Sequence, residues 1–388
     1  MSDSFDQISQ QLKHRHRKSA RLKWLSMGAL GLAGLFLLWF FADMLSKGLP
    51  AFQQAYVETE ISYSEEAAKD ARQAIDSDLI PIVSRTEIRS IPRLLRNEPD
   101  RIGSRETRWL LANSEVDQDL KGHRSKLSDE EMAIVDRLVE SGQVEQKFNS
   151  TFFTQGDSKT AESAGILSAV VGTIMTMIVT LAIAFPIGVM TAIYLEEFAP
   201  DNRFTQLIEI NINNLAAIPS ILFGLLGLAI FINFFGVPRS SPLVGGMTLA
   251  LMTLPVIIIS TRTALRSVPE SIRHAAFGLG CSRWQVVKDH VLPLAMPGIM
   301  TGSIIGLAQA MGETAPLIIV GMVAFIPDVG ASFTEAATVM PAQVFTWASE
   351  PEKAFVEKTA GGILLLLTIL ISLNASAVIL RKKFERRW

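Results

Sequence analysis

Cysteine is nearly absent from this chain: Cys281 is the only one among 388 residues, so no intramolecular disulfide can form. Patterns typical of metal sites are missing as well. His123 is the only histidine between residues 45 and 161, and it has no cysteine or histidine neighbour. We therefore expect no metal site, no cofactor and no catalytic residues.

A phosphate-binding loop of the ATPase type is also missing, because no Gly-Lys-Ser or Gly-Lys-Thr sequence occurs anywhere in the chain. We therefore expect a protein that is not an enzyme and that depends on a separate ATPase for any ATP-driven step. The formal net charge of −2 gives no reason to expect a nucleic-acid partner.

Charge is absent from six long stretches, and this absence is the strongest signal in the sequence. Each stretch has about 19 residues or more, enough for a helix to cross a roughly 30 Å hydrocarbon core. One such stretch is compatible with a buried helix of a soluble protein, but six predict an all-α integral membrane protein with six transmembrane helices. The stretches are residues 24–42, 163–195, 210–238, 240–261, 291–312 and 359–380.

Basic residues indicate how these helices are oriented. Lysines and arginines gather before the first stretch, between the fourth and fifth stretches, and after the sixth. Six helices place all three groups on one side, which the positive-inside rule assigns to the cytoplasm. We thus expect both termini in the cytoplasm, with a first unit at residues 1–44, an external soluble domain at residues 45–161 and a membrane core at residues 162–388.

The external segment has the composition of a charged, mainly helical domain inserted between the first and second membrane helices. Its clearest local signal is Ser128 followed by Glu131, a capping box that predicts a helix with apolar residues at Ile134, Val135 and Leu138. Nothing in this segment identifies a ligand.

The most informative segment precedes the fifth stretch. It reads Arg273-His274-Ala275-Ala276-Phe277-Gly278-Leu279-Gly280, then nine residues, then His290-Val291-Leu292-Pro293. This spacing resembles the EAA loop of ABC-importer permeases, in which Glu-Ala-Ala, three residues and Gly are followed after nine residues by Ile, one residue and Leu-Pro. His274 replaces the Glu of that pattern, and His290 replaces the Ile. We name residues 263–293 the elbow.

The residues of the elbow suit contact with another protein. Small side chains at Ala275 and Ala276 permit close approach, and Gly280 permits a sharp turn at the end of the first short helix. Trp284 offers an apolar surface on a second helix. The resemblance implies that the elbow docks on the ATPase, with these coupling residues: Arg273, His274, Ala275, Ala276, Gly280 and Trp284.

Two further runs of the sequence read Asn214-Leu215-Ala216-Ala217-Ile218-Pro219-Ser220-Ile221-Leu222-Phe223-Gly224 and Met311-Gly312-Glu313-Thr314-Ala315-Pro316-Leu317. Both runs are similar to the PstA-type permeases of phosphate (Pst) importers. The resemblance covers about residues 163–388. It implies a type I ABC-importer permease in the bacterial inner membrane. It also implies as partners a PstC-type permease, a PstB-type ATPase dimer, a periplasmic phosphate-binding protein and phosphate itself. The external segment looks like an N-terminal extension found in some members.

An acid, Glu313, directly follows the fifth stretch. Small residues recur every fourth position, which favours close helix packing. At about 100° per residue, Glu313 lies on the same side as this stripe, so we expect it to face protein or a cavity rather than lipid. The stripe consists of Gly298, Gly302, Gly306 and Ala310.

Two roles for Glu313 stay open: a group in the translocation path or its gate, or a contact that only holds the interface with the other permease. Gln309, where members of the family often carry Arg, lies one turn earlier. The hydroxyl groups of Thr314 and Ser220 are further candidates for the pathway.

Two other functions stay open at this stage. The elbow pattern alone is equally compatible with a permease for another substrate, such as molybdate, sulfate or a polyamine. A membrane sensor whose external domain binds a ligand is the alternative from a different class.

Overall fold

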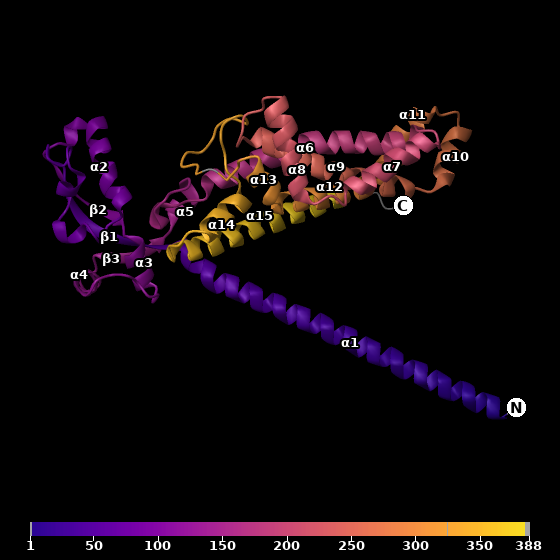
Figure 1. Ribbon diagram of the computed structural model, residues 1–388, viewed down its shortest axis with the longest axis horizontal. Coiled ribbons are helices and arrows are strands. Elements are labelled where there is room, and N and C mark those ends of the chain that lie inside the picture. The colour runs from indigo at the N-terminus through magenta and orange to yellow at the C-terminus, as the bar shows by residue number, and fades with distance from the viewer. Residues whose placement is uncertain (1, 324, 385–388) are drawn as a thin grey trace.

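The structure is a computed structural model that describes residues 2–323 and 325–384. The molecule is elongated and has two parts of unequal size. Figure 1 shows a long helical bundle, a smaller unit containing a sheet at one end of it, and a single helix that diverges from their junction. This helix is α1 (Ser2–Gly48), which packs against α15 (Ala354–Phe384) near the junction.

Five helices of the described chain are long and apolar enough to cross a membrane: Lys18–Phe52, Leu167–Phe198, Pro242–Arg266, Arg283–Gly312 and Ala354–Ile379. The stretch at residues 210–238 differs from the straight span that its composition predicts. It is divided between α7 (Arg203–Leu215) and the helix Ser220–Phe234, which meet at 103°. Pro219 explains the break, because proline disfavours helical geometry in the residue before it. Counted as one span, this pair completes the predicted six.

The smaller unit is built on a three-stranded antiparallel sheet in the order β2-β1-β3. The composition of this segment predicted a mainly helical domain and gave no expectation of a sheet. The signal was present in β1, where Val57, Thr59 and Ile61 alternate with exposed or half-buried residues, as one face of a strand requires. The strands are β1 (Gln53–Ser62), β2 (Arg105–Leu111) and β3 (Val144–Phe148).

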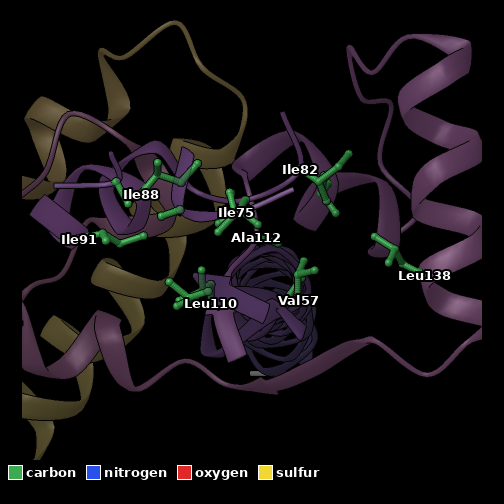
Figure 2. Packing of buried hydrophobic residues seen from close by; sticks show 14 of the residues in the cluster. Val57, Ile75, Ile82, Ile88, Ile91, Leu110, Ala112 and Leu138 are labelled. Carbon is green, nitrogen blue, oxygen red and sulfur yellow. The ribbon is translucent and has the colours of Figure 1, made fainter. Parts of the chain in front are cut away.

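An apolar core holds this unit together. Figure 2 shows Val57 and Leu110 of the sheet packing with Ile88 and Ile91 of α2, all of them buried. The capping box at Ser128 is confirmed, since the Ser128 hydroxyl accepts from the Glu131 amide at the start of α4. The helices of the unit are α2 (Arg85–Asn97), α3 (Ser114–Leu120), α4 (Asp129–Glu140) and α5 (Ser150–Thr154).

The bundle is centred on α9 (Pro242–Arg266), with α6 (Leu167–Ile193) and α12 (Leu292–Gly312) packed along it. The small-residue stripe of α12 makes the close contact expected of it. A Cβ atom on Gly302 would lie 2.0 Å from the Ser260 hydroxyl oxygen, so no larger residue fits there. The remaining helices are α8 (Ser220–Gly227), α10 (Glu270–Gly278), α11 (Arg283–Gln285), α13 (Ala315–Ile319) and α14 (Met340–Ala348).

The sheet unit is joined to α15 by buried charges. The Lys121 ammonium lies 2.6 Å from the Asp117 carboxylate and 2.9 Å from that of Glu357, and the Gln118 amide donates to Glu357 at 2.7 Å. All three charged side chains are buried. A buried ion pair requires well-defined geometry, because a charged group that moves away from its partner there loses the attraction that offsets its removal from water. The unit is therefore fixed in one orientation on the first turns of α15.

Candidate functional site: the broken helices and the elbow

Two helices of the bundle break where the two motif runs lie. α12 ends at Gly312, Glu313 has an extended backbone (φ −75°, ψ 126°), and α13 begins after Thr314. On the other side, α8 begins at Ser220, directly after Pro219. The expectation that Glu313 continues the helical face of Gly302 and Gly306 is therefore wrong, because the helix has already ended.

The two breaks lie against each other through Gly224 and Pro316. A Cβ atom on Gly224 would come within 2.7 Å of the Pro316 Cα atom and 3.2 Å of the Ile319 Cβ atom. Only glycine permits this approach of α8 to α13. The contact joins two runs that lie about 90 residues apart in the chain into one site, which we name the break site: residues 214–224 and 311–317.

The candidate pathway residues all lie at the break site or one turn before it. The side chain of Glu313 is half-buried, as are those of Ser220 and Thr314, whereas Gln309 is exposed. Among the described residues, none of these four side chains takes part in a hydrogen bond or an ion pair. Their polar groups are thus free for a solute, for water or for another chain.

The elbow consists of two helices joined by a glycine turn. α10 ends at Gly278, and Gly280 adopts φ 85°, the left-handed conformation that the sequence predicted at this turn. The second helix differs from the expected short piece. α11, the π-helical segment η8 (Val286–Val291) and α12 form one helix of 30 residues, Arg283–Gly312. The elbow is therefore continuous with the helix that ends at the break site.

Only some of the predicted coupling side chains point outward. Ala275 and His274 are exposed, and Trp284 is 60% exposed. Ala276 is 3% exposed and packs in the apolar core beneath the elbow, so it does not offer the contact surface expected of it. The most exposed apolar residue of the elbow is Leu279, which is 85% exposed and was not among the predicted coupling residues.

Arg273 faces the helical bundle rather than a partner. Its guanidinium contacts the Glu197 carboxylate at 2.7 Å and donates to the carbonyl oxygens of Val268 at 2.7 Å and Leu265 at 3.0 Å. This arrangement ties α10 to the π-helical end of α6, η6 (Tyr194–Phe198). We therefore assign Arg273 to holding the elbow, in place of the direct partner contact expected from the sequence.

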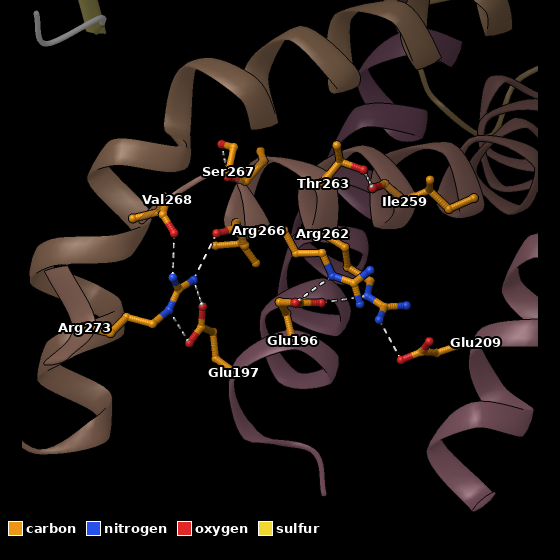
Figure 3. A network of polar contacts seen from close by, with 12 residues as sticks. Glu196, Glu197, Glu209, Ile259, Arg262, Thr263, Arg266, Ser267, Val268 and Arg273 are labelled. Atoms are coloured by element: carbon orange, nitrogen blue, oxygen red, sulfur yellow. Dashed lines mark hydrogen bonds and ion pairs between the residues drawn. The ribbon is translucent and has the colours of Figure 1, made fainter. Parts of the chain in front are cut away.

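A second set of ion pairs extends this anchor, as Figure 3 shows. Arg262 contacts Glu196 at 3.2 Å and Glu209 at 2.6 Å, and Arg266 contacts Glu196 at 2.7 Å. Sequence reasoning did not predict this network. The sequence nevertheless carries a signal for the network. Glu196 and Glu197 directly follow the charge-free stretch 163–195, and Arg262 directly follows the charge-free stretch 240–261.

A sequence model of the family described as "Binding-protein-dependent transport system inner membrane component" matches residues 184–388, more than half of the chain. The chain belongs to this permease family. A second model, described as a domain of unknown function, matches residues 9–80 of the permease.

Several named proteins are similar to this permease. "Phosphate transport system permease protein PstA 1" of Mycobacterium tuberculosis is 30% identical over 226 residues, which are 58% of this chain and 73% of the relative. The PstA protein of Haemophilus influenzae is 29% identical over 57% of this chain and 77% of its own length. A structure of the MetNI methionine ABC transporter aligns with a TM-score of 0.45 and 18% identity, over 55% of this chain and 95% of that one.

The permease is thus of the PstA type, with the fold class expected from its charge-free stretches. It is a multi-pass protein of the inner membrane and contributes to the translocation pathway of an ABC importer. As one component of a binding-protein-dependent system, it works with further subunits.

Proposed function

We propose that this permease forms one half of the translocation pathway of an ATP-driven phosphate importer. The observation that carries the proposal is the break site, in which both motif runs of the PstA-type resemblance meet at Gly224 and Pro316. The names of the relatives that are about 30% identical, which refer to phosphate transport, support the choice of phosphate over molybdate or sulfate.

The chemistry of the break site suits an anion that must bind weakly and leave. Ser220 and Thr314 supply hydroxyl donors, and a helix that begins inside the membrane directs unpaired backbone N–H groups toward its N-terminal end. Glu313 adds a negative charge next to Thr314 in the break site, and this charge opposes prolonged binding of an anion. In this proposal Glu313 acts in the pathway or its gate, and Gln309 lines the approach one turn earlier.

The elbow supplies the coupling to a PstB-type ATPase dimer. The proposed contact surface includes the exposed apolar side chains of Leu279 and Trp284, with exposed Ala275 and His274 beside them. Charged side chains such as Arg283 and Lys288 are exposed on the same elbow, so the surface offered to the ATPase is mixed. Because one continuous helix runs from Arg283 to Gly312, movement of the elbow acts directly on the break site.

The same proposal extends to the partners, the orientation and the domains of the permease. The permease pairs with a PstC-type permease, receives phosphate from a periplasmic binding protein, and has both termini in the cytoplasm. Residues 1–44 then contain the first membrane helix, residues 45–161 the periplasmic domain, and residues 162–388 the core with the elbow. The basic segments at both termini and in the elbow support this orientation.

The substrate is tested by reconstituting the permease with its partner permease, ATPase and binding protein in liposomes. We expect the phosphate-loaded binding protein to stimulate ATP hydrolysis and phosphate uptake, and we expect sulfate and molybdate to have no effect in the same assay. Equal stimulation by sulfate or molybdate would reject phosphate as the specific substrate but leave the permease role intact.

A further inference from the structure

A groove of about 380 Å³ lies at the junction of α1, α15 and the loop that follows α3. Lys47 lines it from α1, Lys353 from the turn before α15, and Arg124 from the loop. We name it the boundary groove. It lies on the opposite end of the membrane helices from the elbow, because α1 ends and α15 begins there.

The cations of the boundary groove are largely uncompensated. Arg124 and Lys353 are exposed, and neither makes an ion pair or a side-chain hydrogen bond with the described residues. Lys47 pairs with Asp43 at 2.8 Å, but both side chains are well exposed, and such surface pairs are weak. Arg124 and Lys353 thus remain available to a ligand, and Lys47 can join them by exchanging a weak surface pair.

Glu357, the one acidic side chain among the described residues that line the groove, is already engaged. The Glu357 carboxylate accepts from Lys121 at 2.9 Å and from Gln118 at 2.7 Å, and the His123 Nδ1 atom lies 3.3 Å from it. Lys121 is shared with Asp117 and offsets the charge of Glu357 only in part, but the three cations that line the groove outnumber this one carboxylate, so the net charge of the lining is positive. An anion is therefore the class of ligand that fits.

Apolar side chains border the cations on the membrane side. Along α1, Leu45 precedes Lys47, and along α15, Val356 follows Lys353; Leu45 is 45% exposed and Val356 is 55% exposed. α1 runs toward the junction and α15 runs away from it, so both helices place the apolar residue nearer the membrane than the cation. This order is typical of the headgroup level of a bilayer.

We propose that the boundary groove binds the phosphate group of an anionic phospholipid, with Lys47, Arg124 and Lys353 around the headgroup. Arg124 supplies the planar guanidinium that matches two phosphate oxygens at once. The acyl chains then lie against Leu45, Val356 and the apolar surface of α1, which Figure 1 shows diverging from the bundle. A free phosphate ion would use the same cations but would leave these apolar side chains uncovered.

The test is native mass spectrometry of the full-length permease in neutral detergent with equal amounts of phosphatidylglycerol and phosphatidylcholine. We expect retention of phosphatidylglycerol to exceed that of phosphatidylcholine by about fivefold or more, since each cation near a lipid surface contributes about that factor. The double variant Arg124→Gln/Lys353→Gln should lose this preference, and each single variant should lose part of it. All these side chains are exposed, so folding is not at risk.

The control is Arg137→Gln/Lys69→Gln, which removes the same charges from exposed positions elsewhere in the sheet unit. It should retain phosphatidylglycerol as the wild type does. An equal loss in the control would show a general charge effect and overturn the site. Displacement of the lipid by millimolar inorganic phosphate would show that the groove takes a free anion, and would overturn the lipid assignment. The readout involves no transport, so it is independent of the proposed substrate.

Discussion

Gly224 of α8 and Pro316 of α13 lie so close that a methyl group on Gly224 would come within 2.7 Å of the Pro316 Cα atom. This contact brings together two helix breaks that each interrupt an apolar stretch. A broken helix exposes backbone groups that an unbroken one satisfies internally, and such exposure inside a membrane is tolerated where the groups line a cavity or face protein.

Glu313→Gln tests the role of the acid at the break site. The change keeps the volume of the side chain and removes its charge, so transport should fall or become leaky while complex assembly stays intact. The measurement is phosphate uptake per assembled complex. Unchanged uptake per complex, with an altered yield of complex, would assign Glu313 to the interface alone. Because position 309 is Gln rather than Arg, no intrahelical ion pair is broken at the same time.

Gly280→Val tests the glycine turn of the elbow. At φ 85°, a residue with a Cβ atom costs roughly 1–2 kcal/mol, and a β-branched one costs more. We expect ATP hydrolysis to continue with reduced transport per ATP. Gly278→Ala is the matched control, since a Cβ atom at either glycine meets open space and only Gly280 has positive φ. Transport by Gly280→Val equal to that of the wild type would reject the coupling role of the turn.

Arg273 and Glu197 should stabilise the elbow as a pair. Arg273→Met leaves the buried Glu197 carboxylate without its guanidinium, and we expect a loss of about 1–3 kcal/mol in unfolding free energy. The double variant with Glu197→Gln should lose less than the sum of the two single losses. Thermal unfolding in detergent measures all three, with Arg203→Met as an exposed control. Additive losses would mean that the pair contributes no coupling.

Glu162 should make stability fall as pH rises. Burial raises the pKa of its carboxyl group above the ordinary 4.5, against the hydrogen bond from the Ser84 hydroxyl. The folded state therefore holds the proton more tightly than the unfolded state, and this group costs stability once pH passes 4.5 and climbs through the raised value.

Glu162→Gln removes that cost and keeps an oxygen for Ser84. We expect a higher melting temperature at neutral pH and a flatter pH dependence between acid and neutral conditions. Glu65→Gln, at an exposed position, should change neither. A lower melting temperature of Glu162→Gln at neutral pH would show that the charged form is favoured, contrary to the assigned direction.

The orientation of the permease is tested with two single-cysteine variants in a Cys281→Ser background. Ala133→Cys lies on an exposed position of α4, and His274→Cys on an exposed position of the elbow. A membrane-impermeant thiol reagent added to intact spheroplasts should label the first and not the second. Labelling of His274→Cys from outside would overturn the assignment of the elbow to the cytoplasm.

The sequence by itself determined the features that depend on local spacing. Charge-free stretches predicted the membrane helices, because a helix must reach across the hydrocarbon core whatever it packs against. Three further features were predictable from a residue type at a fixed position in a short motif. They are the positive φ of Gly280, the capping box at Ser128 and the close packing of Gly302.

Only the tertiary structure decided which distant residues meet. The sequence could not show that Arg273 would turn inward to Glu197, 76 residues earlier, or that Lys121 would find Glu357, 236 residues later. Periodicity also failed at Glu313, because a helical angle has meaning only while the helix continues, and α12 ends at Gly312. Partner choice between segments depends on how helices pack, and that packing is a property of the whole fold rather than of any short run.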